Sequence, residues 1–232
     1  MTLRAGRAVL DAIRADLEVP VKNDPSAPSY LEVILAYPGF QAVTAYRLLH
    51  VLQAAGVPLV PRVLANVVRM FTGVDIHPGA QLGKGFFIDH GTGVVIGETV
   101  ETGDNITLFQ GVTLGGTTTN RVKRHPTLGN NVTIGANASV LGPITLGDNV
   151  KVGSGSVVVK DVPANSTVVG IPAKVVLQDG QPVRMPVPAA QQSEVADAQT
   201  YMIRQLSDKV AALEKRLNDL AGTSASYDDV AI

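Results

Sequence analysis

Two of the four histidines in this 232-residue chain stand beside charged residues that suit acid–base chemistry. His90 lies in the run IDHGTG, directly after Asp89, and the glycines that follow leave space around its imidazole. His125 lies in the run KRHPT, directly after Arg124. An imidazole near a carboxylate can take a proton from an alcohol at neutral pH. His90 and His125 are therefore the candidate catalytic residues, with His90 as general base.

A carboxylate that could orient His90 stands fifteen positions before it, at Asp75. The repeat described below predicts coils of about eighteen residues, which would stack Asp75 close to the imidazole. The alternative is that Asp75 forms only a structural hydrogen bond at a corner. We expect His50 to pack within a helical segment and His77 to form a structural hydrogen bond.

Aliphatic residues recur every six positions through the middle of the chain. The series is Ile76, Leu82, Ile88, Val94, Val100, Ile106 and Val112, then Leu128, Ile134, Val140, Leu146, Val152 and Val158. A period of six fits neither an amphipathic helix nor a simple alternating strand. It predicts a parallel β-helix, in which each unit is a short strand plus a corner and three units close one coil. The absence of Trp suits so narrow an interior.

The repeat is interrupted once by a segment rich in Gly, Thr and basic residues. We expect residues 115–126 to form a loop ejected from one coil, and loops on rigid scaffolds often carry functional sites. Before the repeat, the apolar spacing predicts helices, and Ser29 with Glu32 forms a capping box for one of them.

The chain therefore divides into five expected parts. They are a helical region over 1–73, a β-helix over 74–177, a Pro- and Gln-rich linker over 178–193, a heptad helix over 194–221 and a flexible tail over 222–232. Apolar residues from Ile203 to Leu220 follow the spacing of a coiled-coil seam. The alternative is an amphipathic helix that lies on its own subunit. The predicted fold class is α+β.

Composition excludes several classes of function. Nineteen Lys and Arg residues against twenty Asp and Glu leave a formal charge of −1, so no basic field indicates nucleic acid or anionic lipid. The chain has no Cys, which removes disulfides and thiolate metal sites. No apolar run is long enough for a membrane span, and the first residues lack the apolar block of a signal peptide. We expect a cytoplasmic protein that binds no membrane.

Four motifs occur in order along the chain with compatible spacing. They are DIHP at 75–78, DHGTG at 89–93, TLGGT at 113–117 and RHP at 124–126. With the sequence around them, from about residue 23 to 177, they strongly resemble the serine O-acetyltransferases. These are hexapeptide-repeat acyltransferases whose left-handed β-helices assemble as trimers. The resemblance implies an enzyme that moves the acetyl group of acetyl-CoA to the hydroxyl of L-serine, giving O-acetylserine for cysteine biosynthesis.

The same resemblance assigns roles to matching residues. His90 would be the general base, with Asp75 as its partner. Asp24 and Asp89 would contact the amino group of serine. Arg124 and His125 would hold the carboxylate, which suits the paired donors of a guanidinium. Acetyl-CoA would lie against Gly116, Ala136, Ser154 and Lys174, and no metal is required.

Partners also follow from the resemblance. In a homotrimer the loop of one subunit can reach the next, so His90 and His125 would meet across a boundary. Some family members pair two trimers through longer helical N-termini than the one found here. The acidic tail ending in Ile232 resembles tails that enter the active site of O-acetylserine sulfhydrylase. L-cysteine would be a feedback inhibitor that competes for the serine site.

Three alternatives stay open at this point. A hexapeptide acetyltransferase for a sugar or antibiotic would keep the fold and His90 but would not need Asp24, Asp89 and Arg124 together. A β-helical metal enzyme such as a carbonic anhydrase would need three His ligands at other spacings. A non-catalytic trimeric scaffold would use the heptads and the tail to recruit a partner.

Overall fold

The computed structural model describes residues 3–183 and the isolated helical positions 209–210, 213–214 and 216. The linker predicted over 178–193 begins too early, because Gln178 ends the strand β14 (Ala173–Gln178) and the strand β15 covers Gln181–Pro182. Residues 184–193, most of the predicted heptad helix and the whole tail lie outside the described residues. The helices of the N-terminal region are α1 (Leu3–Asn23), α2 (Tyr30–Ala36), α3 (Pro38–Ala54) and α4 (Val60–Thr72). As the capping box predicts, the Ser29 hydroxyl accepts a hydrogen bond from the backbone N of Glu32 at 3.3 Å. Among the described residues, no helix is long and apolar enough to cross a membrane.

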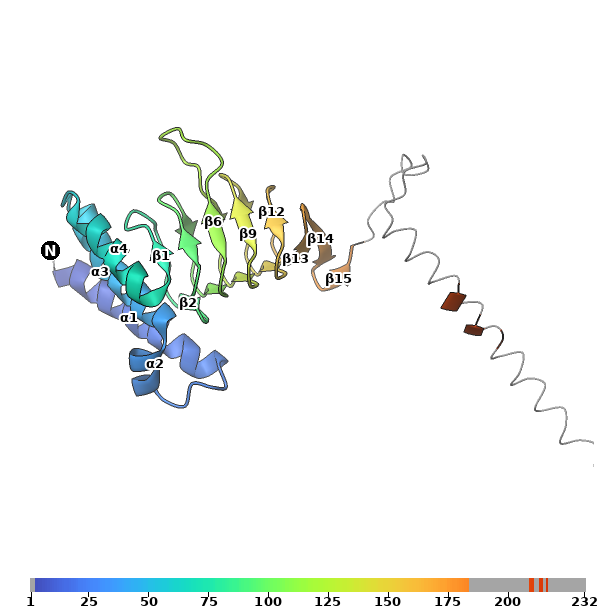
Figure 1. Cartoon of the computed structure of the whole chain (residues 1–232), viewed down its shortest axis with the longest axis horizontal. Helices are drawn as coiled ribbons and strands as arrows, with labels where there is room; N and C mark the ends of the chain where they lie inside the picture. The colour runs from blue at the N-terminus through green and yellow to red at the C-terminus, as the bar shows by residue number, and fades with distance from the viewer. Residues whose placement is uncertain (1–2, 184–208, 211–212, 215, 217–232) are drawn as a thin grey trace, which may run out of the picture. The chain divides into compact units, whose positions relative to one another are not determined.

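Short strands after α4 stack into the three faces of a parallel β-helix (Figure 1). The first sheet contains β1 (Asp75–Ile76), β3 (Val95–Ile96), β6 (Thr113–Gly115), β9 (Ser139–Leu141) and β12 (Val157–Val158). The second contains β4 (Glu101–Thr102), β7 (Thr127–Leu128) and β10 (Thr145–Leu146). The third contains β2 (Phe87–Ile88), β5 (Thr107–Leu108), β8 (Thr133–Ile134), β11 (Lys151–Val152), β13 (Ser166–Gly170), β14 (Ala173–Gln178) and β15 (Gln181–Pro182).

Each six-residue unit buries side chains at two positions, two residues apart. Ile106 and Leu108 are fully buried in one unit, and Val112 and Leu114 in the next. These side chains fill the interior of the prism and exclude water along its whole length. The six-residue period therefore corresponds to the core of a β-helix, as predicted.

The unbroken period from Ile76 to Val112 is nevertheless misleading. Ile88 pairs with Leu108 in the third sheet, whereas Ile96, rather than Val94, pairs with Leu114 in the first sheet. Ile88 and Ile96 are eight positions apart on their coil, whereas Leu108 and Leu114 are six apart on the next, so two residues are inserted at this corner. The spacing hides the insertion because Val94 falls on the other buried position of its unit.

The corner between the second and third sheets is regular. Gly85 occupies it in the first coil, and a row of polar residues with positive φ follows, each hydrogen-bonded through its side chain to the next. The row consists of Asn105, Asn131, Asn149, Asn165 and Asp179, with donor–acceptor distances of 2.8–3.2 Å. Asn and Asp tolerate this left-handed conformation better than other residues with a side chain.

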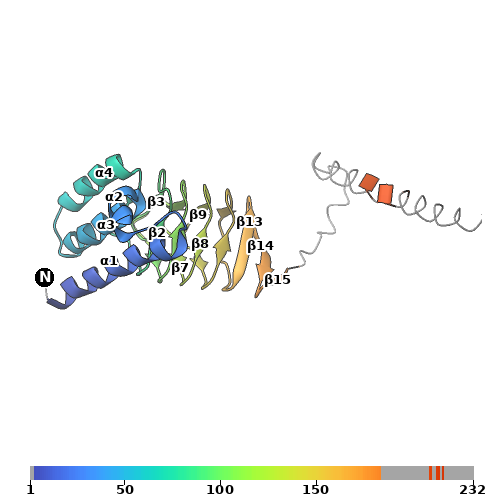
Figure 2. The same cartoon turned by 90° about the horizontal axis from the view of Figure 1, so that it is seen from below.

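The helical region covers one end of the prism (Figure 2). A buried ion pair joins α1, α3 and the first coil, because Arg47 Nε lies 2.7 Å from Asp16 Oδ2. Arg47 also donates to the carbonyl oxygens of Leu82 and Gly83, and Asp16 accepts from the backbone N of Phe86 at 2.8 Å. Charged groups so deeply buried are stable only when they are paired and hydrogen-bonded, as here.

Candidate active site

His90 lies on the two-residue insertion at the corner between the third and first sheets. The inserted residues are His90 and Gly91, which follow Asp89, the first residue after β2. His90 has φ 59°, a left-handed conformation that β-branched and bulky residues seldom adopt. The side chain is 74% exposed, and its Nε2 lies 4.0 Å from Asp89 Oδ2. The corner therefore presents an imidazole outward beside a carboxylate.

A second carboxylate reaches the same corner from the helical region. Asp24 follows α1, and it accepts hydrogen bonds from the backbone N of Ser26 at 2.8 Å and from the Tyr37 hydroxyl at 2.7 Å. The hydrogen bonds from the Ser26 hydroxyl and the Tyr37 hydroxyl lower the pKa of Asp24, and the charge of the nearby His90 adds to this effect. Two carboxylates and one imidazole thus gather here, as an amino-acid site with a general base requires.

Asp75 forms an ion pair with an arginine rather than with His90. It lies in β1, next to β3 in the first sheet, and its carboxylate is 3.5 Å from Arg69 Nη1 on α4. Among the described residues it pairs with this arginine and forms no ion pair with His90. The structure therefore does not bring Asp75 into contact with the imidazole.

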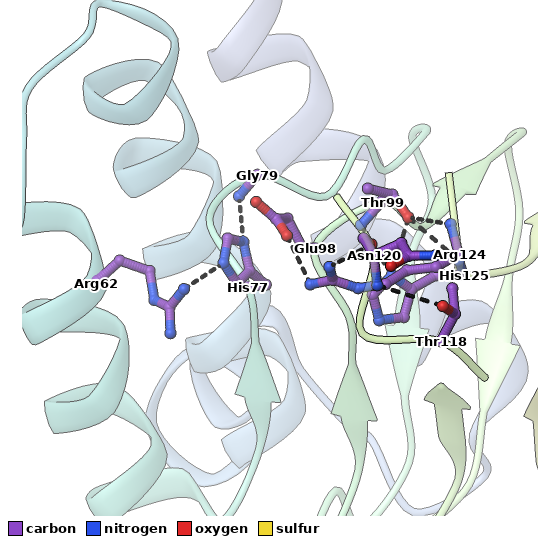
Figure 3. Close-up of polar contacts among 9 residues, drawn as sticks. All are labelled: Arg62, His77, Gly79, Glu98, Thr99, Thr118, Asn120, Arg124 and His125. Carbon is purple, nitrogen blue, oxygen red and sulfur yellow. Dashed lines mark hydrogen bonds and ion pairs between the residues drawn. The ribbon is translucent and has the colours of Figure 1, made fainter. Parts of the chain in front are cut away.

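Arg124 and His125 lie apart from the His90 corner, at the end of the ejected loop that joins β6 of the first sheet to β7 of the second (Figure 3). Arg124 Nη2 donates to Glu98 Oε2 at 2.8 Å and its Nη1 donates to the Asn120 carbonyl at 3.2 Å. The Thr99 hydroxyl accepts from the backbone N of both Arg124 and His125 at 3.1 Å. Glu98 and Thr99 therefore fix the guanidinium and the end of the loop.

His125 is buried and held as a neutral donor. Its Nδ1 accepts from the backbone N of Thr99 at 3.2 Å, so the proton of the neutral ring stands on Nε2. Burial, and then the charge of Arg124, lower the pKa of His125. The ring packs against Gly97, where a Cβ atom would overlap it. A neutral N–H beside a guanidinium suits a carboxylate ligand.

His77, for which we expect only a structural role, also lies on this face. Its Nδ1 accepts from the backbone N of Gly79 at 2.9 Å, and its Nε2 lies 2.5 Å from Arg62 Nη1 (Figure 3). Burial, and then the charge of Arg62, lower the pKa of His77. The hydrogen bond to Gly79 is the expected one, while the contact with Arg62 of α4 was not predicted.

Two of the predicted CoA-binding residues lie on the His90 corner of later coils. Backbone hydrogen bonds run from Gly155 to Ala136 and from Asn137 to Gln110, and this stacks Ala136 and Ser154 along one edge of the prism. Gly116 instead begins the ejected loop and contacts Arg124, and Lys174 lies in β14. A ligand on the edge above His90 would therefore meet small side chains.

Comparison with known proteins identifies the family. Residues 1–45 match the model described as serine acetyltransferase, N-terminal, and residues 125–160 match the bacterial transferase hexapeptide model with six repeats. The serine acetyltransferase of Synechococcus elongatus is 50% identical over 208 residues, which cover 90% of this chain and 84% of that protein. This chain belongs to the serine acetyltransferase family.

Solved serine acetyltransferases share its fold. The structure of the Neisseria gonorrhoeae serine acetyltransferase in complex with serine has a TM-score of 0.72 at 45% identity, and it covers 74% of this chain and 70% of that one. A serine acetyltransferase in complex with cysteine has a TM-score of 0.73 at 36% identity, and it covers 75% of this chain and 72% of that one.

Sequence analysis missed three residues that hold the site residues in place. Tyr37 contacts Asp24, and Glu98 and Thr99 contact the Arg124–His125 segment. The run Gly97–Glu98–Thr99 could have indicated such a role, because the polar pair follows a strand of the repeat and does not fill the core. Tyr37 carried none, since its partner is thirteen residues away on another element.

Proposed function

We propose that this chain acetylates L-serine with acetyl-CoA, using His90 as the general base, and so supplies O-acetylserine for cysteine biosynthesis. Its membership of the serine acetyltransferase family supports the reaction and the co-substrate. The observation that carries the mechanism is the exposed imidazole on the inserted corner, with Asp89 Oδ2 4.0 Å from its Nε2 and with Asp24 held nearby by Ser26 and Tyr37. An acceptor that carries both an ammonium group and a hydroxyl fits this combination.

The chemical step needs a base and a correctly placed thioester. His90 Nε2 takes the proton from the serine hydroxyl while the hydroxyl oxygen forms a bond to the acetyl carbonyl carbon. The carbon–sulfur bond then breaks, and the CoA thiolate receives the proton from His90. Base catalysis of this kind is worth about 10²–10⁴-fold in rate. Asp75 is proposed to orient the imidazole in the assembled enzyme.

The acceptor is proposed to be held at both ends. Asp24 and Asp89 bind its ammonium group, and Arg124 with the Nε2–H of His125 binds its carboxylate. Within the described residues, no hydrogen bond or ion pair joins the Arg124–His125 segment to the His90 corner. We therefore place the complete site between two copies of a homotrimer, the assembly that hexapeptide repeats suggest.

Acetyl-CoA is proposed to lie along the edge of the prism above the His90 corner. Ala136 and Ser154 would contact its pantetheine arm, since small side chains let a ligand approach the backbone. Gly116 would contribute from the ejected loop of a neighbouring copy, and Lys174 would meet the nucleotide phosphates.

Other parts of the family pattern are proposed on sequence grounds alone. They are a trimeric coiled coil over 194–221, pairing of two trimers, and docking of the tail ending in Ile232 into O-acetylserine sulfhydrylase. Inhibition by L-cysteine is proposed to compete with serine, and a related serine acetyltransferase has been solved with cysteine.

The first test is release of thiol from acetyl-CoA with L-serine, L-homoserine or an amino sugar as acceptor. We expect serine-dependent release that collapses in His90→Ala. Co-expression of His90→Ala with Arg124→Ala tests the shared site, because a mixed trimer regains one intact site from two inactive chains. Release with only another acceptor would overturn the serine assignment, and absence of complementation would overturn the shared site.

A further inference from the structure

Tyr37 stands at the junction of two helices, close to the His90 corner. It ends α2 and precedes α3, its backbone N donates to Val33 O at 3.3 Å, and its carbonyl accepts from Gln41 N at 3.1 Å. The ring packs against a small apolar cluster formed by Ala27, Val33 and Phe40. Both the backbone and the ring of Tyr37 are therefore fixed before any ligand binds.

The start of α3 rests directly on the strand that leads to His90. At Gly39, two residues after Tyr37, a Cβ atom would overlap the carbonyl oxygen of Ile88. Ile88 ends β2 and lies two residues before His90. This close backbone approach requires glycine, and it sets the position of Tyr37 relative to the corner.

The Tyr37 hydroxyl is directed at one carboxylate of the proposed ammonium site. It donates to Asp24 Oδ2 at 2.7 Å, while Asp24 Oδ1 accepts from the backbone N of Ser26. The bond to Asp24 raises the pKa of Tyr37 to about 12, so the phenol stays a donor at every working pH. Oδ1 also accepts from the Ser26 hydroxyl, so Oδ2 is the oxygen that keeps a second lone pair for a ligand.

We propose that Tyr37 is a positioning residue for acceptor selection: it holds Asp24 in the orientation that binds the ammonium group of serine beside His90. The inference rests on the proposed function and deepens it, because it names a residue that decides between an amino acid and an acceptor without an amino group. A carboxylate with only the Ser26 contacts could rotate away from the corner. Pre-orientation by the phenol avoids that loss on binding.

The test compares two acceptors in the variant Tyr37→Phe, which keeps the ring and removes the hydroxyl. The acceptors are L-serine and 3-hydroxypropionate, which has the same hydroxyl and carboxylate but no amino group. We expect kcat/KM for L-serine to fall about tenfold, mainly through KM, because a hydrogen bond to a charged group is lost. The value for 3-hydroxypropionate should not change. Where its turnover is slow, its inhibition constant against L-serine gives the same comparison.

Two controls separate positioning from folding. Tyr30→Phe alters a half-exposed tyrosine on α2 and should leave both acceptors unaffected. In an Asp24→Asn background, Tyr37→Phe should have little further effect on L-serine, because both changes act on one contact. Equal losses for the two acceptors, or no loss for L-serine, would overturn the proposal. Failure of the wild-type enzyme to acetylate L-serine would instead overturn the proposed function itself.

Discussion

Two corners of the same prism contain residues with positive φ, but these residues have different roles. Between the second and third sheets, the row from Asn105 to Asp179 repeats without a break, and each side chain bonds to the next coil. Between the third and first sheets, His90 has nearly the same φ but sits on an insertion, and its side chain is exposed. A positive φ is therefore no sign of function by itself. What distinguishes His90 is that its side chain points to solvent, whereas the amides of the row bond to neighbouring coils.

The most severe test of this comparison is deletion of His90 and Gly91 together. The corner would then match the register of the coils above it, so we expect a folded protein with no measurable serine-dependent thiol release. Circular dichroism and thermal unfolding should show a midpoint within a few degrees of wild type. An unfolded deletion variant would mean that the insertion is needed to close the first coil.

Replacement of the imidazole alone should have the next largest effect. We expect His90→Ala to lower kcat by about 10²–10⁴-fold, the usual contribution of a general base. Stability should fall by about 1 kcal/mol or less, because the exposed imidazole has little packing to lose and histidine, like alanine, already bears the strain of the left-handed backbone. Steady-state kinetics and urea unfolding measure the two effects, and full activity in this variant would remove His90 from the mechanism.

Thr99→Val tests the Arg124–His125 segment, which lies away from the His90 corner. The change removes the hydroxyl that accepts from two backbone N–H groups, and we expect kcat/KM for L-serine to fall about tenfold as the segment loosens. Thr118→Val is the matched control, because its hydroxyl bonds only within the ejected loop, to Asn120 N. Equal effects of the two variants would show that the loop, rather than Thr99, sets the kinetics.

In the regular row, Asn149→Ala should cost stability without cost to activity. We expect a loss of about 1–2 kcal/mol, because alanine is strained in the left-handed region. Asn149→Gly relieves that strain and loses only the side-chain bonds to its neighbours, so its loss should be smaller. Urea unfolding and kcat are the measurements, and a loss of kcat would contradict the division between the two corners.

The smallest expected effect is on the pH dependence of stability. Burial lowers the pKa of His125 and of His77 below the ordinary value of 6.5, so the unfolded chain binds protons first as the pH falls. Stability should therefore decline below about pH 6.5, and His125→Gln should flatten that decline. Asn149→Ala should shift the whole curve down without changing its slope, since an amide does not titrate. A slope unchanged in His125→Gln would contradict the role of burial.

The sequence was informative where one residue type repeats or where a motif is contiguous. The six-residue period predicted the β-helix because buried aliphatic side chains leave a regular trace, and the DHGTG motif marked the His90 corner. The insertion at His90 was hidden, since either of two positions in a unit can carry the buried residue. Contacts between distant elements, such as Tyr37 with Asp24, leave no local pattern. The predicted contact of Asp75 with His90 is not formed within one chain.

The end coils of a β-helix offer unpaired strand edges, so such a molecule can pair end to end with another copy. At one end of this prism Arg47 occupies the carbonyl oxygens of Leu82 and Gly83. At the other, the parallel stack turns antiparallel through β14 and closes on the two-residue strand β15, which contains Pro182. Short strands with proline are poor templates for further pairing. Both ends therefore disfavour end-to-end polymerisation. The long faces of the prism are the surfaces that stay open to assembly.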